Sequence, residues 1–148
     1  KIGMFGWSRG GMMTYLALQK SDKIKTAIVG NGPTDLFGLI ADRPIMENIV
    51  TSECIPNYWE NKEAELKKRS VIYWANELDT NSSLLILCGT KDKRVNPVQA
   101  DKIAAKLTEI NYDFVLKKYE TNHSFTDKRK ELNQEVINWF NTRLKEIK

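Results

Sequence analysis

The sequence predicts an α/β fold with about four parallel strands and helices on both faces of the sheet. Short apolar runs alternate with longer segments whose apolar residues recur at helical spacing, in the order β-α-β-(mixed)-β-α-β-α. One run, residues 84–88, is apolar throughout, which is typical of a strand covered on both faces. Because parallel neighbours need long crossover connections, this alternation favours a parallel sheet.

The first half of the chain opens on a strand and a helix. The apolar residues within 2–5 predict the strand, and residues 10–18 predict the helix. Residues 24–29 contain β-branched side chains and predict a second strand, closed by a turn rich in glycine and proline. The pattern over 34–83 is the least clear, although alternating Glu and Lys at 61–69 indicate a helix.

The second half predicts strand, helix, strand and helix. After residues 84–88, Asn96 and Pro97 are the expected N-cap and first residue of a helix. Residues 114–119 predict the last strand. The apolar face of the last helix is expected to contain Leu132, Val136, Ile137, Phe140, Leu144 and Ile147. The sequence has no internal repeat, and we expect residues 1–148 to form a single domain.

Composition excludes several classes of function. The formal net charge of +4 comes from short basic clusters close to acidic residues, which indicates a solvated surface and argues against nucleic-acid binding. No stretch is apolar enough for a membrane span, so we expect no membrane partner, and we expect a cytoplasmic protein. Cys54 and Cys88 are too few for a disulfide framework, and Cys88 is expected to be buried. With a single histidine, a zinc site of the usual ligand count is excluded.

The first predicted turn carries the motif Gly6-Trp7-Ser8-Arg9-Gly10-Gly11, which contains the pattern G-x-S-x-G. A strand before it and a helix after it are the context of a nucleophile elbow, the sharp turn that presents the serine of an α/β-hydrolase. Ser8 is therefore the candidate nucleophile, and the backbone N–H of Arg9 is a candidate oxyanion donor at the helix N-terminus. The alternative is a glycine-rich helix start with a capping serine.

Two further candidates follow later strands. Asp92 comes just past residues 84–88, at the end of a parallel sheet where active-site groups gather. His123, the only histidine, lies between the last strand and the last helix. Alone, Asp92 could be an acidic turn residue and His123 an ordinary surface histidine. Together with Ser8 they follow the α/β-hydrolase order of nucleophile, acid and histidine, and we therefore expect a Ser-His-Asp triad. Other aspartates compete with Asp92, but none directly follows the central strand: Asp79, Asp101, Asp113 and Asp127.

At these motifs the chain resembles the carboxyl-terminal part of the catalytic domain of the prolyl oligopeptidase family of serine peptidases. The resemblance rests on the motif at 6–11, on Gly89-Thr90-Lys91-Asp92 with Val95 three positions on, and on Asn122-His123. The separations, 84 residues from the serine to the aspartate and 31 from the aspartate to the histidine, are similar to those of the family. The resemblance implies a partial α/β-hydrolase fold, with the chain as the carboxyl-terminal half of a catalytic domain.

The resemblance also implies roles for single residues. Ser8 would attack a carbonyl, His123 would act as general base and then acid, and Asp92 would orient the imidazole, with no metal or cofactor. Val95 would help to line the pocket for the residue before the scissile bond.

Leu36 and Phe37 are weaker candidates for the same pocket. The implied substrates are short peptides, often cleaved after proline or another small residue. A carboxylesterase or acyl hydrolase is the alternative, since some similar hydrolases act on esters.

The position of the elbow carries a further expectation. The chain begins at Lys1 and enters a strand at once, so we expect a fragment in which the strands upstream of the elbow are absent. By the resemblance, a second oxyanion donor would come from that upstream segment, and an inactive folded fragment is therefore another alternative. The apolar edge of residues 2–5 would be exposed, and we expect it to favour a homo-oligomer.

Overall fold

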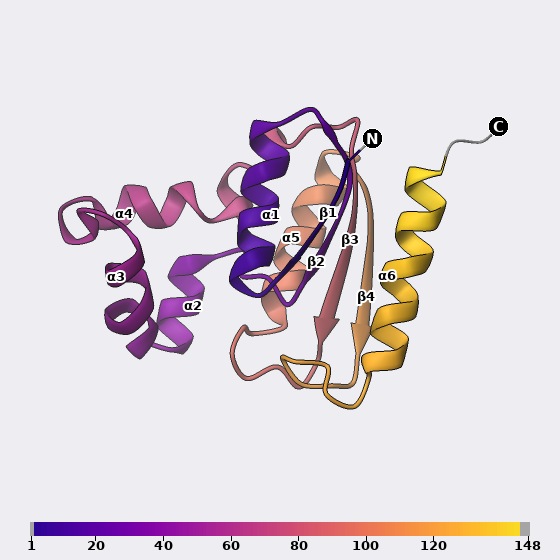
Figure 1. Cartoon of the computed structure of the whole chain (residues 1–148). Helices are drawn as coiled ribbons and strands as arrows, with labels where there is room; N and C mark the ends of the chain where they lie inside the picture. The colour runs from indigo at the N-terminus through magenta and orange to yellow at the C-terminus, as the bar shows by residue number, and fades with distance from the viewer. Residues whose placement is uncertain (1, 146–148) are drawn as a thin grey trace.

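Four parallel strands form one sheet in the computed structural model of this protein, which describes residues 2–145. The strands are β1 (Ile2–Trp7), β2 (Ile24–Gly30), β3 (Ser83–Gly89) and β4 (Asp113–Tyr119), and they lie side by side in chain order (Figure 1). The predicted α/β architecture is confirmed. Because all four strands run the same way, their carboxyl ends meet at one edge of the sheet, where the loops can assemble a site.

Helices cover both faces of this sheet (Figure 1). The helices α1 (Arg9–Lys20) and α5 (Val98–Glu109) belong to crossovers between neighbouring strands and lie on one face, while α6 (Arg129–Leu144) follows β4 and returns on the other. Successive right-handed crossovers in one direction place their helices on the same face. The helix α5 begins at Val98, one residue later than predicted, and the Asn96 side chain accepts a hydrogen bond from the Val98 N–H at 3.1 Å.

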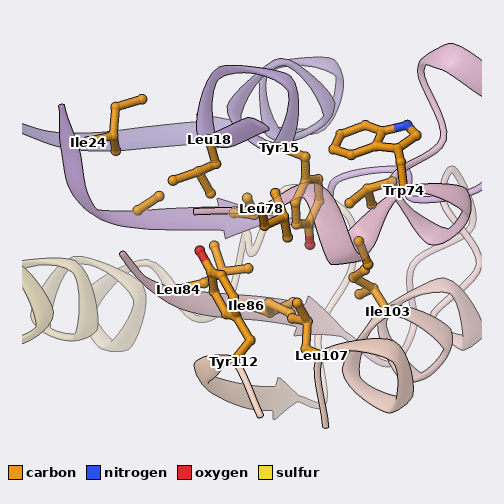
Figure 2. Packing of buried hydrophobic residues seen from close by; sticks show 14 residues of the cluster. Tyr15, Leu18, Ile24, Trp74, Leu78, Leu84, Ile86, Ile103, Leu107 and Tyr112 are labelled. Carbon is orange, nitrogen blue, oxygen red and sulfur yellow. The ribbon is translucent and has the colours of Figure 1, made fainter. Parts of the chain in front are cut away.

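Alternate residues of the central strands build two separate cores, as the two-residue repeat of a strand requires. Leu84 and Ile86 of β3 pack with α1 and α5, and Figure 2 shows them with Tyr15, Leu18 and Ile103. The intervening side chains face α6: Ile28, Leu85 and Leu87 lie in a cluster with Phe125, Leu132 and Trp139. Every residue of β3 is buried, which agrees with its continuous apolar sequence.

The buried face of α6 differs from the prediction. Ile137 is 54% exposed, whereas Trp139 is buried and donates a hydrogen bond from its Nε1 to Thr26 Oγ1 at 2.7 Å. Each helical residue turns about 100°, so Trp139 shares the side of Leu132, and Ile137 points well away from it. Ile147 lies outside the described residues.

The segment between β2 and β3 is mostly helical. Its first part lies beside α1, away from the sheet, and its last turns pack in the core that covers the sheet (Figures 1 and 2). It consists of α2 (Leu36–Asp42), a π-helical turn (Glu47–Thr51), α3 (Ser52–Cys54), α4 (Tyr58–Lys68) and two short 3-10 turns (Val71–Tyr73 and Ala75–Glu77). Its core contains Leu36, Leu39, Ile55, Tyr58 and Leu66, together with Val95 from the loop after β3. In the part of the chain that the structure describes, no helix is long and apolar enough to cross a membrane.

Candidate active site

Ser8 lies in the sharp turn between β1 and α1. Its backbone has φ 55° and ψ −120°, a conformation that costs free energy for any residue with a side chain. Two hydrogen bonds hold it there: the Ser8 N–H donates to the Gly30 carbonyl, and the Ser8 carbonyl accepts from the Gly11 N–H, both at 2.8 Å. This strained turn at the carboxyl end of a strand has the geometry of a nucleophile elbow.

Glycines around Ser8 let the turn and the helix come close. A Cβ on Gly6 would collide with the Gly10 carbonyl and with the Thr14 hydroxyl. A Cβ on Gly11 would lie 2.8 Å from Gly32 Cα, so α1 approaches the loop after β2 only because Gly11 has no side chain. A Cβ on Gly10 would meet open space, so packing does not require a glycine at this position.

Asp92 and His123 form a buried pair beyond the ends of β3 and β4. The His123 Nδ1 lies 2.7 Å from Asp92 Oδ2, and both side chains are at most one-tenth exposed. The other carboxylate oxygen of Asp92 accepts from the backbone N–H groups of Arg94 at 2.7 Å and Val95 at 3.1 Å. The carboxylate is held from both sides, so a neutral His123 would carry its proton on Nδ1 and leave Nε2 as an acceptor.

The competing aspartates have other partners. Asp79 accepts from Asn81, Asp101 pairs with Lys118, Asp113 pairs with Arg143, and Asp127 accepts from Thr121. Within residues 2–145, Asp92 is the aspartate that pairs with the histidine.

The loop that carries His123 reaches back across the sheet. The strands β1 and β4 are the outer strands, and spacings of about 4.8 Å put them roughly 14 Å apart. The loop and the Trp7 side chain together close this distance, since the His123 carbonyl accepts hydrogen bonds from Trp7 Nε1 at 3.0 Å and from Asn31 Nδ2 at 2.8 Å. Phe125, which is fully buried, packs its ring edge-on against Trp7 at 5.2 Å. The backbone of His123 is thus hydrogen-bonded to Trp7, the residue that precedes Ser8.

Asn31 is a site residue that sequence reasoning missed. It is buried, and its backbone has a positive φ of 44°, which asparagine adopts more readily than most residues. Its side chain donates to the His123 carbonyl and accepts from the Gly89 N–H, each at 2.8 Å. Asn31 therefore connects the end of β3 to the histidine loop. Its sequence context indicated only a turn.

The Ser8 hydroxyl makes no hydrogen bond to His123 within the described residues. Such contacts are often long in unliganded enzymes and tighten when substrate binds. Arg9 is the first residue of α1, so its backbone N–H has no acceptor within the helix and remains available beside Ser8.

No group of three or more His, Cys, Asp or Glu side chains that could hold a metal ion occurs in residues 2–145.

A cavity of about 690 Å³ opens beside Ser8. Leu36 and Val95, two of the predicted pocket residues, line it. Leu36 is held by Ser70, whose buried hydroxyl accepts from the Leu36 N–H at 2.8 Å. Phe37 is not among the lining residues, and its ring packs edge-on against Tyr73 at 5.8 Å.

Comparison with known proteins yields consistent similarities. The sequence model of the prolyl oligopeptidase family matches residues 1–146. A protein of Schizosaccharomyces pombe that is provisionally named a dipeptidyl aminopeptidase is 27% identical over 131 residues, which cover 86% of this chain and 14% of that protein.

The fold of this chain is similar to parts of several solved structures. The acylaminoacyl peptidase of Pyrococcus horikoshii is 22% identical with a TM-score of 0.83, over 100% of this chain and 25% of that one. Dipeptidyl peptidase 4 of Porphyromonas gingivalis is 23% identical with a TM-score of 0.78, over 96% of this chain and 19% of that one. The chain spans a quarter or less of the length of these proteins.

Proposed function

Because this chain belongs to the prolyl oligopeptidase family, we propose that it carries the Ser-His-Asp triad of a serine peptidase, with Ser8 as nucleophile, His123 as general base and Asp92 as its orienting partner. The observation that carries the proposal is the buried Asp92–His123 pair, 2.7 Å between Oδ2 and Nδ1, in a loop bound to the residue before Ser8. The rest of the elbow geometry supports it, because the strained turn presents Ser8 at the same edge of the sheet.

The reaction follows from these positions. His123 Nε2 takes the proton of the Ser8 hydroxyl as its oxygen attacks the substrate carbonyl. The backbone N–H of Arg9 donates to the oxyanion that forms, and the Asp92 carboxylate stabilises the imidazolium. His123 then gives its proton to the leaving amine, which leaves an acyl group on Ser8. A water molecule, deprotonated by His123, then attacks the acyl carbon, and His123 returns the proton to the Ser8 oxygen as the bond to the acyl group breaks.

The cavity beside Ser8 supports a short peptide or small acyl group as substrate. Its walls include Leu36, Leu39 and Val95, which suit an apolar group on the residue before the scissile bond. The same chemistry would hydrolyse an ester, so the choice of substrate separates a peptidase from an acyl hydrolase.

A fluorophosphonate probe tests the proposal directly, since it reacts only with an activated serine. We expect the 148-residue chain to be labelled at Ser8, and the label to disappear in His123→Ala. Ser124→Ala is the matched control and should remain labelled. An unlabelled chain would indicate an inactive folded unit. Among labelled chains, cleavage of a peptide anilide, with either Gly-Pro or Ala-Glu before the scissile bond, supports a peptidase, and cleavage of a p-nitrophenyl ester alone supports an acyl hydrolase.

A further inference from the structure

The cavity beside Ser8 has a strongly one-sided charge. Its lining contains six basic residues and no acidic one: Arg9, Lys20, Arg43, Lys68, Arg69 and Arg94. The remaining walls are mostly apolar, from α1, α2 and the loop after β3. The cavity therefore combines an apolar interior surface with several cations beside the candidate nucleophile.

Four of these cations have no carboxylate partner within residues 2–145: Arg9, Lys20, Arg43 and Arg94. By contrast, Arg69 pairs with Glu65, and Lys68 lies 4.0 Å from the same carboxylate. The three unpaired arginines, together with Lys20, thus supply the free positive charge of the cavity.

The chain order and one hydrogen bond place two of the unpaired arginines beside Ser8 and Val95. Arg9 follows Ser8, and its guanidinium donates to Cys54 Sγ, another lining atom, at 3.6 Å. The Arg43 guanidinium donates to the Arg94 carbonyl at 3.1 Å, which places it beside Val95. One hydrogen bond to a carbonyl leaves most of the five guanidinium donors of Arg43 free for a ligand.

Nearby acidic side chains are directed to other partners. Asp42, next to Arg43 in the chain, accepts a hydrogen bond from Asn96 at 3.1 Å. Glu47 pairs with Lys62 at 2.5 Å and accepts from the Tyr58 hydroxyl at 2.7 Å. These carboxylates do not line the cavity, so they leave its cations uncompensated.

We propose that this cavity selects substrates whose acyl side carries a carboxylate, on the side chain of the residue before the scissile bond or at the end of a dicarboxylic acyl group. An apolar stem would lie against Leu36 and Val95, and the carboxylate would accept hydrogen bonds from the free arginines. The inference rests on the proposed function, because it names the substrate class of the same site. Since Arg9 and Arg94 are exposed, added salt should weaken the preference.

Glutamate and glutamine substrates test the charge alone, because the two side chains have nearly the same shape. Hydrogen bonds to a charged group should give acetyl-Ala-Glu-p-nitroanilide a kcat/KM about tenfold or more above that of the Gln compound. The double variant Arg9→Met/Arg94→Met should lower this ratio severalfold, although Arg43 remains, and it retains the Arg9 backbone N–H. Lys93→Met is the matched control, since Lys93 is exposed next to Arg94 but does not line the cavity, and its ratio should be unchanged.

A second pair of compounds separates the two sources of the carboxylate. Glutaryl-p-nitroanilide and its terminal amide place the same charge on a free acyl group in place of a peptide. A preference for the charged member in this pair alone assigns the cavity to dicarboxylic acyl groups, and a preference in the Glu pair assigns it to peptides. Equal rates within both pairs would overturn the inference.

Binding to Ser8→Ala keeps the test independent of turnover. N-acetyl-glutamate α-amide should bind about tenfold or more tightly than the glutamine analogue in calorimetry, with the difference reduced in the double arginine variant. Equal affinities would contradict the inference even if Ser8 reacts with fluorophosphonate. A clear preference for glutamate without any labelling of Ser8 would instead overturn the peptidase proposal and leave the carboxylate selectivity standing.

Discussion

The indole N–H of Trp7 donates a hydrogen bond of 3.0 Å to the backbone carbonyl of His123, a residue 116 positions later in the chain. Trp7 immediately precedes Ser8, so this bond connects the elbow to the histidine loop. It explains how groups from the two outer strands of the sheet come to one place. The distance across the sheet is closed by a loop and a tryptophan, with further support from Asn31.

Loss of the Trp7 donor should loosen the histidine loop. Trp7→Phe retains an aromatic ring against Phe125 but leaves the His123 carbonyl with one donor fewer. We expect a loss of about 1 kcal/mol in the free energy of unfolding and a slower reaction of Ser8 with fluorophosphonate. Urea unfolding and labelling kinetics measure the two effects. Trp59→Phe, at a tryptophan that is 60% exposed, should change neither, and equal effects of both substitutions would argue against the link.

Removal of the Asn31 amide should lower the free energy of unfolding more than Trp7→Phe does. Asn31→Gly tolerates the positive φ but leaves the Gly89 N–H without its partner and the His123 carbonyl with one donor fewer. A buried unsatisfied group costs about 1–3 kcal/mol, so we expect a loss of this size in the free energy of unfolding. Asn111→Gly is the matched control, because Asn111 also has a positive φ but is exposed, and it should be nearly neutral in chemical denaturation. A neutral Asn31→Gly would show that the amide does not hold the loop.

The edge of β1 should drive self-association of the 148-residue chain. Within the described residues β1 pairs only with β2, and its side chains Ile2 and Phe5 are 51% and 45% exposed. Unpaired edges with apolar side chains are prone to pair with another chain. Light scattering should show oligomers that Phe5→Lys reduces and Ile137→Lys, on α6, does not. A stable monomer at high concentration would count against this expectation.

Acid should weaken the helical segment between β2 and β3 through Glu47. Hydrogen bonds from Lys62 and Tyr58 hold the pKa of Glu47 below its ordinary value of 4.5. A lowered folded-state pKa means that the pairing contributes its full stability above pH 4.5 and loses it as the pH falls through the folded-state pKa. The protection of α4 against hydrogen exchange, taken relative to the unfolded-chain rate at the same pH, should therefore fall below pH 4.5 in the unsubstituted chain.

Glu47→Gln removes the titrating group from this interaction. Its α4 should be less protected against hydrogen exchange at neutral pH, and its protection should fall less in acid. Glu53→Gln, on the exposed side of α3, should retain the behaviour of the unsubstituted chain. An identical acid response in Glu47→Gln would assign the effect to another carboxylate.

Local patterns were sufficient for the strands, for most helices and for the positions of Ser8, Asp92 and His123 in loops after strands. The contacts that join those loops could not be predicted, because Trp7, Asn31 and His123 are far apart in the chain and the sheet brings them together. Apolar periodicity also placed Ile137 wrongly on the buried side of α6. A helix with several apolar residues has more than one side that could be buried, and here the buried side is the one whose Trp139 indole N–H donates to the Thr26 hydroxyl.

The cavity was predictable only in part. Val95 and Leu36 were identified through the family resemblance, but the arrangement of α2, α3 and α4 around them was not, because residues 34–83 show no clear period. The grouping of Arg9, Arg43 and Arg94 depends on that arrangement.

The rate at which Ser8 reacts with fluorophosphonate in Asp92→Asn tests the triad most directly. An asparagine can keep the acceptor that binds the Arg94 and Val95 N–H groups, but its amide would face His123 Nδ1 and favour the wrong tautomer. We expect a folded variant whose labelling rate falls by about 10³–10⁴. An unchanged labelling rate in this variant would contradict the assignment of Ser8, His123 and Asp92 as a catalytic triad.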